Sequence, residues 1–117
     1  MMKRFIYPLQ GLRTLLKKDR NFILHLLAAL IVILAGLFFR LTTLEWLFII
    51  IAIFTVLVAE VLNTSVEFVV DLVTEDYHEL AKHAKDTAAF AVVLASFMSA
   101  LIGLIIFIPY ILMLLAA

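Results

Sequence analysis

The stretch Glu60-Val-Leu-Asn63-Thr64-Ser65-Val-Glu67-Phe-Val-Val-Asp71 places charged and amide side chains inside, and at the end of, an otherwise apolar segment. On an α-helix, with about 100° per residue, four of these side chains fall within roughly an 80° arc. They are Glu60, Asn63, Glu67 and Asp71, and we call them the acidic stripe. Ionisable groups are costly in lipid and usually mark a functional site. We therefore expect the chemistry of this protein on the acidic stripe.

The composition of the chain predicts an all-α integral membrane protein. Of its 117 residues, 67% are hydrophobic, whereas about half are apolar in soluble domains, and the mean hydropathy is +1.22. Three apolar stretches, about residues 22–39, 44–72 and 87–115, each reach the ~17 to 25 residues that cross a bilayer. We expect three transmembrane helices in a single domain over residues 1–117.

Positive charge is distributed unevenly across this topology. Eight of the nine lysines and arginines fall on one side, and only Arg40 falls on the other. Because an excess of positive charge marks the cytoplasmic side, we expect the N-terminus and the turn between the second and third spans to be cytoplasmic. Trp46 and Tyr110 then lie at the outer interface, where aromatic side chains commonly anchor spans.

Two segments outside the spans carry their own signals. Residues 3–20 have apolar side chains at helical spacing between basic ones, which predicts an amphipathic helix on the inner membrane surface. Anchorage and a part in ligand binding are both open for this helix. Before the third span, Asp76 is followed three residues later by Glu79, which predicts a capping box at the start of the next helix.

The residues near the inner membrane boundary suit the binding of a divalent cation and nucleotide phosphates. Mg²⁺ takes one or two protein carboxylates and keeps phosphate oxygens and water as its other ligands, and Glu67 is placed for that task. Lys85 would neutralise phosphate charge, and Asn63 would orient a neighbouring group by hydrogen bonding. Glu60 lies deeper and is less hydrated, which suits a general base acting on a hydroxyl at the lipid boundary.

Several alternatives compete with this interpretation. Polar side chains also join helices in lipid, although three carboxylates on one face repel one another unless a cation is present. A proton-coupled exporter would use Glu60 as a shared proton and substrate site, but it leaves Glu67 and Lys85 unexplained. A non-catalytic assembly subunit is a third alternative. The chain has no cysteine and no GxxxxGK[ST] phosphate loop, and zinc spacing is absent among its histidines, which are His25, His78 and His83.

The chain resembles the bacterial diacylglycerol kinases, small membrane enzymes unrelated to soluble kinases. The resemblance covers nearly the whole chain and is carried by Glu60-x-Leu62-Asn63-Thr64-Ser65-Val66-Glu67-x-x-Val70-Asp71, Tyr77-His78-x-Leu80-Ala81, Ala84-Lys85-Asp86, Gly11-Leu12-Arg13 and Asn21-Phe22. The spacing through residues 83–89 and the short N-terminus are more similar to the Gram-positive members, whose preferred substrate is undecaprenol. The enterobacterial type prefers diacylglycerol.

The resemblance implies a homotrimer of three-span subunits in the bacterial cell membrane. Such an enzyme phosphorylates a lipid alcohol from MgATP at cytoplasmic sites shared between subunits, and nucleic acid is not an expected partner. Glu60 matches the catalytic base of the family, and Asn63 matches its polar companion. Glu67 matches a metal-binding glutamate, whereas Asp19 stands where the family usually places a second one. The positions around the nucleotide are matched by Tyr7, Asp19, Glu67, Asp71, His78, Glu79, Lys85 and Asp86.

Overall fold

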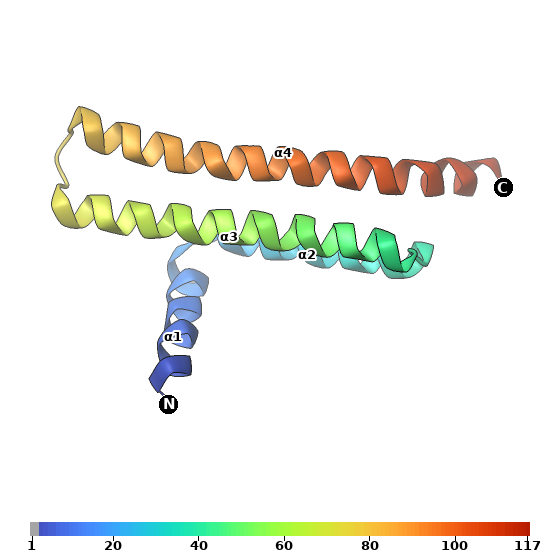
Figure 1. Ribbon diagram of the computed structural model, residues 1–117, viewed down its shortest axis with the longest axis horizontal. Coiled ribbons are helices and arrows are strands. Elements are labelled where there is room, and N and C mark those ends of the chain that lie inside the picture. Colours follow the sequence, from blue (N-terminus) through green and yellow to red (C-terminus); the bar gives the residue numbers. More distant parts are fainter. Residues whose placement is uncertain (1–2) are drawn as a thin grey trace.

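The structure, a computed structural model, describes residues 3–117 and is all-helical over that range. Its four helices are α1 (Lys3–Lys18), α2 (Arg20–Phe39), α3 (Thr43–Val73) and α4 (Glu79–Ala116). α3 packs against α4 along most of its length, and α2 packs against another face of α3, while α1 projects crosswise from the start of α2 (Figure 1). The first two residues of the expected single domain lie outside the described range.

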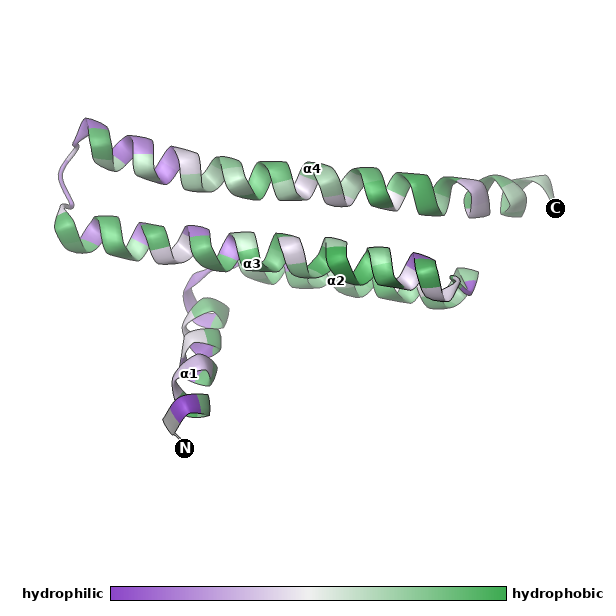
Figure 2. Ribbon diagram, in the orientation of Figure 1, coloured by the Kyte–Doolittle hydropathy of each residue, from purple (hydrophilic) through white to green (hydrophobic). Residues whose placement is uncertain are grey.

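The three expected spans are confirmed as long apolar helices. α2, α3 and α4 are each long and apolar enough to cross a membrane. Figure 2 shows hydrophobic residues over most of their length, with hydrophilic residues gathered in α1 and towards the α3–α4 turn. The third span and the helix expected to lead into it are one continuous helix, α4. α1 is helical as expected, and its place at a membrane surface stays a prediction.

The turn between α2 and α3 is fixed by two sets of local hydrogen bonds. Arg40 ends α2 in the left-handed conformation, with φ 56°, and its backbone N–H donates to the carbonyl of Gly36. The Thr42 hydroxyl then accepts from the backbone of Glu45, and a Glu45 carboxylate oxygen accepts from the backbone of Thr42. This capping box begins α3. The Thr-x-x-Glu pattern signals it in the sequence, although sequence analysis did not single it out.

A small core holds the three spanning helices together near this turn. Its buried side chains are Leu41, Ile49 and Ile106, and aromatic side chains pack around them. The hydroxyl of Tyr110 on α4 donates a hydrogen bond to Glu45, so the carboxylate that caps α3 also binds α4. Trp46 belongs to the same cluster. The two aromatic residues expected at the outer interface therefore lie at the same end of the molecule.

We expect Gly36→Ala to lower the stability of the subunit. A Cβ at this position would lie 2.6 Å from the indole ring of Trp46 and 3.0 Å from the side chain of Leu41, and such overpacking costs about 1–3 kcal/mol. The thermal unfolding midpoint in detergent measures the effect. Gly103→Ala is the matched control, because nothing lies within 4 Å of its added methyl and alanine favours a helix interior over glycine by about 0.5–1 kcal/mol. Equal midpoints for the two variants would contradict the close approach.

The predicted capping box at the α3–α4 turn is wrong. α4 begins at Glu79, and its N-cap is His78, whose Nδ1 accepts a hydrogen bond from the backbone of Leu80. The backbone of Asp76 instead donates to the Thr74 hydroxyl, which closes a separate local turn. A histidine ring nitrogen can accept a hydrogen bond in the same way as a carboxylate, and sequence patterns based on Ser, Thr, Asp and Asn do not anticipate it.

Candidate active site

The acidic stripe is graded from a buried end to an exposed end. Glu60 is only 3% exposed and Asn63 only 7%, although α3 faces open space on several sides. Glu67 and Asp71 lie one and two turns beyond Asn63 along α3, and both are exposed. Because α3 has 31 residues and is roughly 46 Å long, it exceeds the ~30 Å hydrocarbon core. The sequence-based placement of Glu60 at greater depth than Glu67 agrees with this gradient in burial.

Glu60 lies between acidic and imidazole side chains. Its Oε2 atom is 3.9 Å from Nε2 of His25 on α2. Asp19 reaches this face of α3 through its hydrogen bond with Thr64, one turn after Glu60, and Glu67 follows two turns after Glu60 on the same helix. Carboxylates clustered in this way repel one another unless cations or protons compensate them. A cation or a proton bound at this cluster would relieve that repulsion.

Asp19 joins α2 to the acidic stripe. It is the N-cap of α2, where its Oδ1 accepts a hydrogen bond from the backbone of Phe22 at 3.1 Å. Its Oδ2 accepts from the hydroxyl of Thr64, the residue after Asn63, at 2.5 Å. This contact places the break between α1 and α2 level with the middle of the stripe. It also explains why aspartate suits this position, because aspartate is a stronger N-cap than longer acidic side chains.

Asn63 has an unsatisfied polar atom next to these carboxylates. Its amide nitrogen donates to Glu67 Oε1 at 3.5 Å, one turn along α3. Its Oδ1 atom is buried and has no hydrogen-bond partner within residues 3–117. A buried polar atom without a partner costs about 1–3 kcal/mol, so this oxygen is available to accept a hydrogen bond or to bind a cation.

A second group of predicted site residues lies around the α3–α4 turn. Lys85 Nζ is 2.7 Å from Asp71 Oδ1 and joins the two helices. Lys82 Nζ is 2.6 Å from Asp86 Oδ2 on the same helix. A polar pocket of about 380 Å³ lies beside them, and the predicted site residues that line it are His78, Lys85 and Asp86.

Lys85 lies level with Asp71 rather than with Glu67. Its position at the entrance to the third apolar stretch predicts that Lys85 lies at about the depth of Glu67, but the ion pair with Asp71 shows an offset of one helical turn along α3, which is about 6 Å. The extra residues before α4, which form a turn and not the predicted helix start, produce this offset. Lys85 therefore lines the pocket at the turn and pairs with Asp71 rather than with a carboxylate nearer to Glu60.

Some predicted residues are not brought together within one subunit. α1, which carries Tyr7, projects from α2 and α3 on the side away from α4 (Figure 1), so it does not bring Tyr7 to the turn pocket. Glu79 is exposed and lies 3.6 Å from His83 on its own helix. Within residues 3–117, no group of three or more histidine, aspartate and glutamate side chains is arranged to hold a metal ion.

Sequence reasoning missed two contributors to this site. Thr64 is buried and binds Asp19, and its position one turn after Glu60 was a signal that could have placed it on the same face. His25 contacts Glu60 from α2. A histidine in an apolar span is a signal in itself, but the partner on another helix is visible only in the fold.

Comparisons with known proteins show which family the chain matches. Residues 6–107 match the prokaryotic diacylglycerol kinases. An undecaprenol kinase of Bacillus subtilis is 40% identical over 107 residues, which cover 92% of this chain and 87% of that protein. A diacylglycerol kinase of Synechocystis is 36% identical over 93% of this chain and 63% of that protein. The diacylglycerol kinase of Escherichia coli K12 is 29% identical over 76% of this chain and 73% of that protein.

The site and these similarities define a lipid kinase built from helices that are long and apolar enough to cross a membrane. The chain belongs to the prokaryotic diacylglycerol kinase family, in agreement with the resemblance drawn from its motifs. Neither the family nor the relatives support the exporter that was considered as an alternative use of Glu60.

Proposed function

We propose that this protein transfers the γ-phosphoryl group of MgATP to the hydroxyl of a membrane lipid alcohol, with undecaprenol as the preferred acceptor and diacylglycerol as the second candidate. The products would be undecaprenyl phosphate or phosphatidic acid, together with ADP. The observation that carries the proposal is the burial of Glu60 on a membrane-crossing helix, two to three turns from carboxylates and a lysine that are accessible to water. A lipid hydroxyl and a nucleotide can meet only at such a boundary.

In the proposed reaction, Glu60 acts as the general base. Its carboxylate takes the proton of the acceptor hydroxyl while the alcohol oxygen forms a bond to the γ-phosphorus and the bond between that phosphorus and the bridging oxygen of ADP breaks. Asn63 and the Asp19–Thr64 hydrogen bond hold the surrounding groups in place. Most of the rate would come from positioning and electrostatics, as is usual for phosphoryl transfer.

The oxygen donors near Glu60 suit a magnesium ion. Mg²⁺ binds oxygen atoms and commonly takes one or two carboxylates from the protein. Glu67 and Asp19 would hold it, and the buried Oδ1 of Asn63, which has no partner within residues 3–117, is a further oxygen available to the ion or its waters. The bound ion would supply neutralisation of the phosphate charge.

The pocket at the α3–α4 turn supports a place for the nucleotide. Lys85 would neutralise phosphate charge, and His78 and Asp86 line the same pocket. In this proposal Asp71 holds Lys85 in position through their 2.7 Å contact. Glu79 is the first residue of α4 and follows His78. In this proposal it lies at the edge of the nucleotide site.

A homotrimer with sites shared between subunits would complete the nucleotide site. Tyr7 lies on α1, which projects away from the rest of its own subunit (Figure 1), and a neighbouring subunit is what such a helix can reach. Many large apolar side chains of α2 and α4 are exposed in the single chain, so lipid or another subunit must cover them. Covalent cross-linking in detergent followed by mass measurement counts the subunits.

The placement of charge supports a cytoplasmic active site in the bacterial cell membrane. α1 and the α3–α4 turn lie towards one end of the spanning helices (Figure 1), and all lysines and arginines except Arg40 belong to the segments at that end. The excess of positive charge favours the cytoplasm. α1 would then lie along the inner membrane surface, with the exposed side chains of Phe5, Ile6 and Leu9 available to the lipid.

The acceptor assignment can be tested directly. The purified protein is incubated in detergent with γ-labelled ATP, Mg²⁺ and either undecaprenol or dioleoylglycerol, and the labelled lipid is extracted. We expect label in undecaprenyl phosphate, because the undecaprenol kinase of Bacillus subtilis is similar over most of both chains. Label only in phosphatidic acid would reverse the order of acceptors. No labelled lipid from either acceptor at any magnesium concentration would overturn the proposed function.

We expect Asp19→Asn to separate the two roles given to this residue. Asparagine is as good an N-cap as aspartate, so the thermal unfolding midpoint should change little, while the loss of the negative charge should raise the Mg²⁺ concentration that gives half-maximal activity. Asp19→Ala is the matched comparison, because it also removes the cap and should destabilise the protein by about 0.5–2 kcal/mol. An unchanged magnesium titration for both variants would leave Asp19 as a structural residue only.

A further inference from the structure

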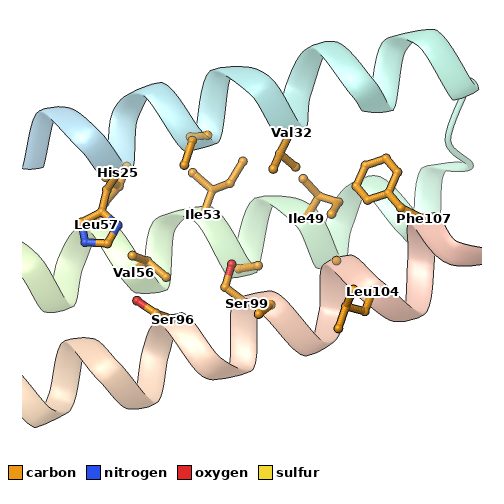
Figure 3. Close-up of a pocket in the computed structure, with 15 residues that line it drawn as sticks. His25, Val32, Ile49, Ile53, Val56, Leu57, Ser96, Ser99, Leu104 and Phe107 are labelled. Carbon is orange, nitrogen blue, oxygen red and sulfur yellow. The ribbon is translucent and has the colours of Figure 1, made fainter. Parts of the chain in front are cut away.

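Figure 3 shows an apolar groove that runs along the spanning helices and has His25 at one end. The groove has a volume of about 560 Å³ and is lined by α2, α3 and α4. Val32, Ile49 and Ile53 form part of its wall, and Phe107 lies near the opposite end from His25 (Figure 3). A groove of this kind suits a hydrocarbon chain.

The polar end of the groove meets the proposed base. Nε2 of His25 is 3.9 Å from Oε2 of Glu60, and the imidazole is 26% exposed while Glu60 is 3% exposed. This separation is too long for a direct hydrogen bond. The imidazole therefore stands between the groove and Glu60 without being bonded to the carboxylate.

The separation fits a hydroxyl oxygen that contacts both groups. An oxygen about 2.8 Å from each of the two atoms forms a triangle whose base is the 3.9 Å distance. With hydrogen on Nε2, the imidazole donates to a lone pair of the hydroxyl oxygen, and the hydroxyl donates its own hydrogen to Glu60. The second lone pair of the oxygen remains available to attack phosphorus.

The neighbouring polar side chains are engaged elsewhere. The Thr64 hydroxyl donates to Asp19, and the Asn63 amide donates to Glu67. Ser96 and Ser99 line the groove from α4, Ser96 near the end that holds His25 and Ser99 further towards Phe107 (Figure 3). His25 is the groove-lining donor whose ring nitrogen lies 3.9 Å from Glu60.

We infer that His25 positions the hydroxyl of the lipid alcohol against Glu60, with the hydrocarbon chain next to that hydroxyl lying in the apolar groove. This inference rests on the proposed function, because it requires a lipid alcohol as the acceptor. His25 is a positioning residue: the proton of the hydroxyl goes to Glu60, and His25 neither gains nor loses a proton in the transfer. The directed hydrogen bond fixes the angle at which the oxygen approaches phosphorus.

The test compares His25→Ala with His25→Gln in the purified full-length protein. We expect His25→Ala to lower kcat with undecaprenol by about 10- to 100-fold, with the KM for MgATP unchanged. His25→Gln keeps an N–H donor of similar reach and should recover part of the loss, which a purely structural role does not predict. His83→Ala is the matched control, since His83 is exposed on the cytoplasmic part of α4, and its kcat should equal that of the parent protein.

A replacement variant and the activity of the parent protein separate a failure of this inference from a failure of the proposed function. If His25→Ala fails to fold, as judged by its thermal unfolding midpoint, His25→Leu replaces it, since leucine fills the site without an N–H donor. An unchanged kcat in His25→Ala, or equal kcat values for His25→Gln and His25→Leu, would overturn the inference while the parent protein still makes labelled lipid. Absence of labelled lipid with the parent protein would instead overturn the proposed function.

Discussion

Glu60→Gln is expected to abolish lipid phosphorylation while leaving nucleotide binding intact. The substitution keeps the shape of a side chain that is only 3% exposed but removes its ability to accept a proton. Loss of a general base typically costs about 10²- to 10⁴-fold in rate. The rate is measured by transfer of label from γ-labelled ATP to undecaprenol, and nucleotide binding is measured separately with a fluorescent ATP analogue.

The stability of the same variant gives an independent check. An ionised carboxylate is costly to bury, and a neutral amide of the same shape is less so, so the thermal unfolding midpoint of Glu60→Gln should stay the same or rise. Glu45→Gln is the matched control on the same helix, because Glu45 binds Thr42 and Tyr110 at the far end of α3 and should affect stability without lowering turnover. Near-normal turnover of Glu60→Gln would remove Glu60 from the role of base.

Glu67→Gln is expected to weaken the binding of the magnesium ion that activity requires. Glu67 is exposed, lies one turn before Asp71 on α3 and accepts a hydrogen bond from Asn63, so its carboxylate is available to a cation from the water side. Replacement by an amide should raise the Mg²⁺ concentration for half-maximal activity by at least about 10-fold, since even indirect partners of a metal site contribute that much. A magnesium titration at saturating ATP measures this shift.

A second metal distinguishes loss of the ligand from general damage. Mn²⁺ binds protein sites more tightly than Mg²⁺ and accepts the same oxygen donors, so it should restore part of the activity of Glu67→Gln. Glu45→Gln again serves as the control, with a titration that matches the parent protein. A magnesium titration of Glu67→Gln that coincides with the parent curve would exclude Glu67 as a metal ligand.

The sequence was sufficient to place the spans and the acidic stripe. Hydropathy located α2 and α3 to within two residues of their observed bounds, because long apolar runs have few alternatives to a membrane helix. The third apolar stretch, from about residue 87, marked only the part of α4 that follows its first eight residues. The helical period put Glu60, Asn63, Glu67 and Asp71 on one face of α3, and the structure keeps them on that helix with burial decreasing along it. These features depend only on the order of residues within one helix.

Contacts between helices could not be predicted in the same way. The pairing of Lys85 with Asp71 depends on where α4 begins, and the unexpected His78 cap shifted that start. The Asp19–Thr64 and His25–Glu60 contacts depend on how α2 is rotated against α3. Neither the length of a turn nor the rotation of a helix follows from hydropathy, because many rotations bury similar apolar area.

The near-complete burial of Glu60 also bears on how fast bound ATP would be hydrolysed by water when no lipid acceptor is present. With 3% of its surface exposed, the carboxylate is seldom reached by solvent water, and a closed site prevents unwanted side reactions. A nucleotide held at the turn before any acceptor arrives would therefore meet no activated water, and futile hydrolysis would be slow. Burial of a charged side chain destabilises the protein, but the same burial would let bound ATP remain intact until a lipid acceptor binds.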